Sequence, residues 1–235
     1  EDIDTVKNAI ASYEENKNVQ YAEADYVLNS GSNDSLYNNL WGLNNVGQNG
    51  GTADADIDAP EAWGITRGST DVLVAIIDTG IDYNHSDLAA NMWTNPGETG
   101  TDNNGNNKAS NGIDDDNNGY VDDFRGWDFV NNDNDSMDDN SHGTHCAGTI
   151  GAVGDNNVGV IGVAPEVRMV GLKFLSASGS GYLSDAVKAI QYSNTIGVDI
   201  SSNSWGGGGY SQSLKDAIDA SADRNILFVA AAGNS

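Results

Sequence analysis

Basic residues are scarce in this sequence of 235 residues. It contains 10 Lys and Arg against 35 Asp and Glu, which gives a formal net charge of −25 at pH 7. Neutralising the phosphates of a nucleic acid or the surface of an anionic membrane requires clustered Lys and Arg. The composition therefore argues against both kinds of partner, and we expect cations or neutral peptides instead.

Cysteine and long apolar runs are also nearly absent. The one cysteine, Cys146, rules out an internal disulfide framework, so extracellular stability would have to come from packing or from metal ions. No segment approaches the apolar run of about 20 residues that spans a bilayer. The sequence has no initiating Met and no basic-then-apolar leader, and it starts in the middle of a pattern, so we expect it to continue at both ends.

The first 30 residues have the pattern of a small separate module. Residues 4–15 have helical spacing, and residues 19–28 alternate as a strand does. The polar stretch NSGSND at 29–34 then breaks the pattern. We interpret residues 1–30 as a module ahead of a main domain of residues 31–235. The alternative is an N-terminal decoration of the same core.

From residue 71 onward, apolar segments alternate with helical patterns. We expect strands at 72–77, 167–173, 198–203 and 226–231, and helices at 142–152, 183–196 and 213–224. Continuous apolar strands interleaved with helices predict an α/β fold, with a parallel sheet covered by helices on both faces. In such sheets the working site lies beyond the carboxyl ends of the strands, which is where Asp78, Ser204 and Asn234 fall.

Asp78 and His142 have the chemistry of a proton-transfer pair. Asp78 follows an apolar strand, so its carboxylate lies at the edge of a low-dielectric core and needs a hydrogen-bonding partner. His142 follows Ser141, a favourable helix N-cap. An imidazole there can shuttle protons near neutral pH, and a buried Asp can fix its tautomer. Taken alone, Asp78 fits a turn-capping role equally well.

Asn234 ends a run of very small residues, AAAGN at 230–234. These side chains leave a recess into which the amide can donate a hydrogen bond. Acyl transfer requires such a donor, aimed at a developing oxyanion. A structural turn asparagine after a glycine is the alternative.

Four short blocks carry a family resemblance. They are DTGID at 78–82, HGTHCAGT at 142–149, NSWGG at 203–207 and AAAGN at 230–234. Their order resembles that of the subtilisin-like serine peptidases, the subtilases. The resemblance implies that Asp78 is the triad aspartate, His142 the general base and Asn234 the oxyanion-hole amide. It also implies a segment that pairs with the substrate backbone, formed by Ser204, Trp205 and Gly206.

The family's serine nucleophile is missing from the sequence. In the family it lies in a later G-T-S-x-[AS]-x-P block, and no such string occurs here. Ser69 and Ser235 are poor substitutes, because Ser69 precedes a Thr instead of following one and Ser235 directly follows the oxyanion-hole Asn. Without a nucleophile the Asp-His pair should not form an acyl-enzyme. We therefore expect a serine-type endopeptidase chain that is inactive alone.

The first module ends in NVQYAEADYVLN, which resembles the close of subtilase propeptides. Such propeptides inhibit the catalytic domain and assist its folding. This resemblance implies a secreted zymogen whose own propeptide is an intramolecular inhibitor. Residues 1–30 would be the C-terminal part of that propeptide, and residues 31–235 the N-terminal two-thirds of the catalytic domain.

An acidic loop has the spacing of a calcium site. Segment 114–122, DDDNNGYVD, has oxygen donors at relative positions 1, 3, 5 and 9, with Gly119 at position 6 permitting a sharp turn. The donors are Asp114, Asp116, Asn118 and Asp122. Arg125 stands where an EF-hand has its last acidic ligand, so we expect another kind of loop site, with further ligands from Asp123 or neighbouring segments. A disordered acidic loop is the alternative.

A second calcium site follows from the resemblance alone. Asp87 matches a family calcium ligand, and the loop 154–165 resembles the one that wraps this ion, with Asn156 as its side-chain donor. Asn157 is the alternative donor, because the loop is one residue longer than in familiar members. A third acidic group precedes His142 and is a further candidate: Asp133, Asp135 and Asp138.

Two other functions fit parts of the sequence. One is a non-catalytic, calcium-dependent binding module that kept the fold and lost the serine. The other is a metallohydrolase that uses Asp78, His142 and His145. Zinc hydrolases, however, usually place two His four residues apart with a Glu between them, which is not the pattern here. We assign His145 a structural role, and we interpret Cys146, which resembles the thiol of one branch of the family, as an inert small hydrophobe.

Overall fold

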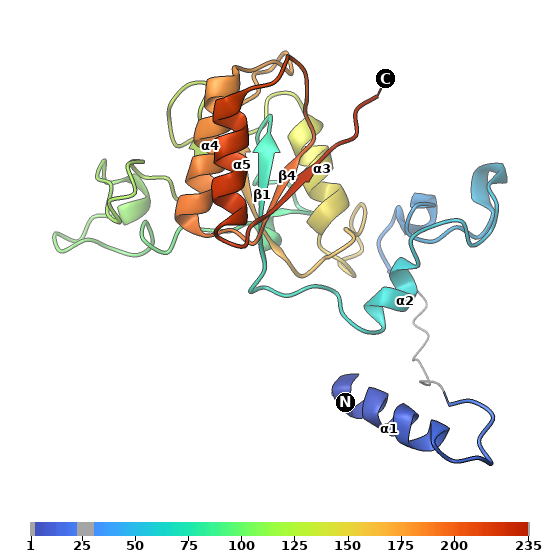
Figure 1. Cartoon of the computed structure of the whole chain (residues 1–235). Coiled ribbons are helices and arrows are strands. Elements are labelled where there is room, and N and C mark those ends of the chain that lie inside the picture. The colour runs from blue at the N-terminus through green and yellow to red at the C-terminus, as the bar shows by residue number, and fades with distance from the viewer. Residues whose placement is uncertain (1–2, 23–30, 235) are drawn as a thin grey trace.

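The computed structural model describes residues 3–22 and 31–234, and its centre is a five-stranded sheet (Figure 1). The strands are β1 (Leu73–Asp78), β2 (Gly126–Asp128), β3 (Arg168–Lys173), β4 (Ile200–Asn203) and β5 (Leu227–Ala230). They lie in the order β2-β3-β1-β4-β5, and every neighbouring pair is parallel. The carboxyl ends of all five strands therefore meet at one edge of the sheet.

The described residues also form helices, and those that lie against the sheet cover both of its faces. The helices are α1 (Ile3–Glu14), α2 (Ala59–Trp63), α3 (His142–Gly151), α4 (Leu183–Ile196) and α5 (Gln212–Ala222), with short 3-10 turns at Tyr37–Asn39, Gln48–Gly50, Ala89–Asn91 and Lys108–Ser110. Figure 1 shows α4 and α5 side by side on one side of β1, and α3 on the other. The structure confirms the predicted α/β fold, with a parallel sheet between helical layers.

Side chains along β1 alternate between two hydrophobic cores. Ala75 and Ile77 pack in one cluster with residues of α4 and α5, whereas Val74 and Ile76 pack in the other with Ala147 of α3. All six residues of β1 are buried. A central parallel strand covered on both faces has no solvent side, which explains its unbroken apolar sequence.

The predicted helices and strands of the main domain are confirmed, with ends within two residues of those expected. Strand β2, of three residues, and helix α2, of five, were not expected, because such short elements carry little periodicity. The strand expected at 19–28 does not form over residues 19–22, and its remaining residues lie outside those that the structure describes.

Helix α1 confirms the helical pattern expected at 4–15, and it stands apart from the sheet in Figure 1. Over residues 3–22 and 31–234, no helix combines the length and the apolar character that crossing a membrane requires. The candidate site lies on the sheet, on the helices α3, α4 and α5 that cover it, and on their loops.

Candidate active site

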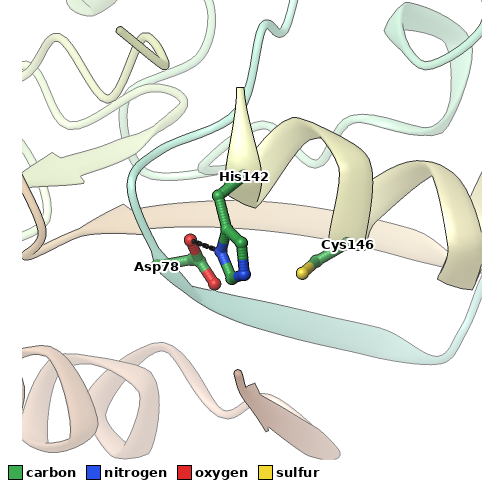
Figure 2. A group of neighbouring side chains, drawn as sticks. All are labelled: Asp78, His142 and Cys146. Carbon is green, nitrogen blue, oxygen red and sulfur yellow. Dashed lines mark hydrogen bonds and ion pairs between the residues drawn. The ribbon is translucent and has the colours of Figure 1, made fainter. Parts of the chain in front are cut away.

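The structure brings Asp78 and His142 together at the carboxyl edge of the sheet (Figure 2). Asp78 ends β1 and its side chain is 1% exposed, whereas His142 begins α3 and its side chain is 49% exposed. His142 Nδ1 lies 2.7 Å from Asp78 Oδ1. Because a carboxylate only accepts hydrogen bonds, Nδ1 carries the proton and Nε2 is left to accept one. The pair has the geometry of an oriented general base.

Close backbone packing sets the position of this pair. Gly143 N donates to Thr79 Oγ1 at 2.9 Å, so the first turn of α3 touches the residue that follows Asp78. A Cβ on residue 143 would lie 2.1 Å from Gly80 O. Any larger residue would push the helix away from the strand. His142 reaches Asp78 because the residue after it is glycine.

Asp138, and not Ser141, caps the start of α3, which corrects the sequence analysis. Ser141 stands at the N-cap position with φ 84°, and its side chain makes no capping hydrogen bond. Asp138 Oδ2 accepts from Thr144 N and Thr144 Oγ1, and its Oδ1 accepts from Ser141 N, Asn140 N and Thr79 Oγ1. These donors occupy both oxygens, so Asp138 acts as the structural cap of α3.

Replacing Asp138 with alanine should destabilise the fold in a pH-dependent way. Burial alone would raise the pKa of Asp138, but the hydrogen bonds from Thr144, Asn140 and Thr79 outweigh it and lower that pKa below its ordinary 3.8. The stabilisation is therefore present above the unfolded-state pKa and is lost as pH falls through the folded-state pKa. We expect Asp138→Ala to lower the free energy of unfolding by about 2 kcal/mol at pH 7 and by less near pH 3. Urea unfolding at both pH values measures this, and an equal loss at both would contradict it.

A pocket of about 570 Å³ opens beside His142. Its lining includes the three residues expected to bind the substrate backbone, Ser204, Trp205 and Gly206. Glycines and both polar and apolar side chains complete the wall, and Trp205 packs edge-on against Phe174 with ring centroids 5.0 Å apart. The structure thus places the predicted substrate segment next to the predicted base.

His145 lines a different pocket, of about 660 Å³, which contains neither Asp78 nor His142. This placement does not favour a metallohydrolase centre made of the three residues. Asn234 is exposed beyond the edge strand β5 and does not line the pocket beside His142. Its oxyanion role stays a prediction.

Cys146 lies close to the pair, as Figure 2 shows. Ligating atoms of Asp78, His142 and Cys146 all lie within 4.8 Å of one another. Burial raises the pKa of the Cys146 thiol, so the thiol stays protonated near neutral pH. Because the thiolate is the nucleophilic form, Cys146 is a poor replacement for a serine nucleophile.

The acidic loop forms a carboxylate cluster that contains the predicted Asp116 and Asp123 together with Glu98, which was not predicted. Oxygens of Glu98, Asp116 and Asp123 all lie within 4.8 Å of one another. Glu98 and Asp123 are fully buried, and Glu98 Oε2 has no hydrogen-bond partner among the described residues. Asn118 Nδ2 donates to Asp116 and to Asp123. A buried, unpaired carboxylate oxygen in such a cluster fits a hard divalent cation.

Asp122, one of the four predicted ligands, lies outside this cluster, and its role as a ligand stays a prediction. Both of its carboxylate oxygens accept from Gly112 N at 3.0 Å. The residue has a left-handed φ of 55°, which breaks the alternation on which the spacing rule relied, and Asp123 takes its place. Asp114 accepts from the backbone N–H groups of the loop, including Gly119 N at 2.8 Å. Sequence spacing within the loop could not identify Glu98, because it precedes the loop.

The second predicted calcium group also comes together. Asp87, which is 2% exposed, accepts from Asn156 Nδ2 at 2.8 Å and from Val160 N at 2.9 Å. Asn156 is thus the loop side chain beside Asp87. Asp34, which was not among the predicted residues, is buried and accepts from Asp155 N at 2.9 Å and Asn156 N at 3.0 Å. No local pattern links Asp34 to a loop so far along the chain.

Comparison with known proteins gives consistent matches. Residues 69–235 match the model of the subtilase family. "Subtilisin-like protease 1" of Plasmodium berghei is 36% identical over 219 residues, 93% of this chain and 34% of that protein. "Thermophilic serine proteinase" of Bacillus sp. strain AK1 is 31% identical over 235 residues, 99% of this chain and 48% of that protein. Thermitase of Thermoactinomyces vulgaris is 34% identical over 179 residues, 76% of this chain and 53% of that protein.

The chain spans between about a third and about half the length of these relatives. The family match covers well over half of the chain, and it includes the whole sheet with α3, α4 and α5. On this evidence, the chain belongs to the subtilase family.

Proposed function

We propose that this chain supplies the aspartate and the histidine of a serine-type endopeptidase. The observation that carries the proposal is the 2.7 Å contact between His142 Nδ1 and Asp78 Oδ1 beside a pocket. Asp78 orients the imidazole and stabilises its charged form, and His142 Nε2 takes the proton of a serine hydroxyl during attack on a peptide carbonyl. Asn234 donates to the resulting oxyanion, and residues 204–206 pair with the substrate backbone.

In this proposal the serine comes from outside residues 1–235, so the chain alone does not hydrolyse peptides. Residues 1–30 act as the C-terminal part of an inhibitory propeptide, and residues 31–235 form the N-terminal two-thirds of the catalytic domain. The protein is secreted as a zymogen and acts on proteins or peptides. The strongly acidic composition supports the absence of nucleic-acid and membrane partners.

We propose calcium as the structural ion at two groups. The first is held by Glu98, Asp116 and Asp123, with Asp114 and Asn118 ordering the loop around it. The second is held by Asp87 and Asn156, with Asp34 beside them. Calcium would supply positive charge and oxygen coordination that cross-link segments far apart in the sequence. No catalytic step depends on it.

A serine-directed fluorophosphonate tests the proposed activity. We expect the full-length protein to cleave casein and to lose that activity completely after labelling. Cleavage that resists the reagent but requires bound zinc would point to the metallohydrolase instead. A properly folded, calcium-loaded protein that neither reacts nor cleaves would favour the non-catalytic binding module.

A further inference from the structure

Lys173 is a buried charged residue that the proposed mechanism leaves unused. It ends β3, and in the sheet register it lies beside Asp78 of β1 and Asp128 of β2. Its side chain is 2% exposed. Burying an ammonium is costly unless it is paired and hydrogen-bonded, so its partners decide what this residue does.

The ammonium of Lys173 has three acceptors at hydrogen-bond distance. Nζ lies 2.7 Å from Thr79 O, 3.0 Å from Leu175 O and 2.5 Å from Asp139 Oδ1. An ammonium has three N–H donors and no acceptor, so each donor has one partner. Thr79 and Asp139 belong to segments that are distant from Lys173 in the sequence, and Leu175 lies two residues after it.

The two distant segments carry the proposed catalytic pair. Thr79 directly follows Asp78, and Asp139 lies in the short loop that leads into His142. Leu175 belongs to the wall of the pocket beside His142. Lys173 therefore donates hydrogen bonds to the segment that carries Asp78, to the segment that leads into His142 and to the wall of the pocket.

We propose that Lys173 is a positioning residue that holds Asp78 and His142 in register and fixes the Leu175 wall of the pocket. Its effect on catalysis rests on the proposed function, whereas its effect on the geometry of the pair does not. In a low-dielectric interior each of these charge-assisted hydrogen bonds is stronger than in water. A misplacement of catalytic groups by about 1 Å costs about 100-fold in rate.

Lys173→Met in the full-length protein removes the ammonium and keeps an unbranched apolar side chain. We expect kcat for peptide cleavage to fall by about 100-fold, with a smaller change in KM. Lys215→Met is the matched control, because Lys215 is an exposed lysine of α5 paired with Asp219. That control should cleave at the wild-type rate.

A second measurement reports on the Asp78–His142 pair and does not depend on peptidase activity. The proton between His142 Nδ1 and Asp78 Oδ1 gives a low-field ¹H NMR signal, which we expect in the wild type and in Lys215→Met. It should shift or broaden in Lys173→Met, while thermal melting shows that this variant is folded. A signal that responds to Lys173 in a protein without peptidase activity would refute the proposed function and support the positioning role. A signal and a kcat that do not change in Lys173→Met would overturn the positioning role.

Asp139→Ala, which removes the acceptor, decides the question if Lys173→Met does not fold. Asp139 is half exposed, so the fold should tolerate the change, and Lys173 keeps its two carbonyl partners. We expect the same NMR signal to shift and kcat to fall several-fold. An unchanged signal and rate in this variant would overturn the proposal.

Discussion

Replacing His142 with alanine should lower kcat for peptide cleavage by the full-length protein by about 10⁶-fold. The 2.7 Å contact with Asp78 orients this imidazole, which we propose as the base, and no other histidine in the described part of the chain lines the pocket beside it. Asp78→Asn should cost about 10⁴-fold, because the imidazole remains but loses the acceptor that fixes its tautomer. Initial rates on a chromogenic peptide measure both losses, and labelling by a fluorophosphonate should slow in parallel.

His145→Ala is the matched control for this experiment. His145 is on the same helix but lines a different pocket, so cleavage should remain near the wild-type rate. The metallohydrolase alternative makes the opposite prediction, because it uses His145. Full activity in His142→Ala, or a comparable loss in both variants, would contradict the serine mechanism.

Removal of calcium should lower the melting temperature by on the order of 10 °C. Without a cation, the buried carboxylates of Glu98 and Asp123 repel each other, and Glu98 Oε2 has no partner among the described residues. An ion present at about 1,000 times its dissociation constant stabilises the folded state by about 4 kcal/mol. In a domain of this size each kcal/mol corresponds to about 2–4 °C. Thermal melts with excess chelator and with excess calcium measure the difference.

Two loop variants test which residues hold the ion. Glu98→Gln should reduce the calcium dependence of the melting temperature and leave the part that the group around Asp87 contributes. Asp122→Asn should leave it intact, because the oxygens of Asp122 face Gly112 N. The reverse result would restore the ligand set predicted from spacing alone.

The sheet and its Asp-His pair could be predicted because their signals are local. Strand β1 is buried along its whole length, so its apolar run is continuous in the sequence. Helix α4 has the predicted ends, since Gly197 adopts a left-handed φ of 73° directly after it. Once strands are parallel, the residues that follow them gather at one edge. Asp78 could therefore be placed at that edge, whereas His142, which begins a helix, could be assigned as its partner through the resemblance of its sequence block to the subtilases.

The remaining contacts could not be predicted because they join distant segments. Glu98 meets Asp123 only after the acidic loop has folded back, and Asp34 meets Asn156 across more than a hundred residues. The cap of α3 depends on the left-handed backbone of Ser141, which directs Asp138 to the helix start. Periodicity and spacing describe neighbours in sequence, and they carry no information on such pairings.

The hydrogen bonds around Asp34 also determine how many N-terminal residues can be removed without disturbing the folded domain. Asn33 N donates to Asp155, Asp34 accepts from the backbone of the loop, and Leu36 N donates to Gly159 O at 2.8 Å. A protease that cuts ahead of residue 32 leaves all of these bonds in place. A cut beyond Asp34 removes the acceptor of two backbone N–H groups and frees the loop beside Asp87. We therefore expect proteolysis from the N-terminus to preserve the folded domain only while it stays ahead of these hydrogen bonds, whichever protease acts.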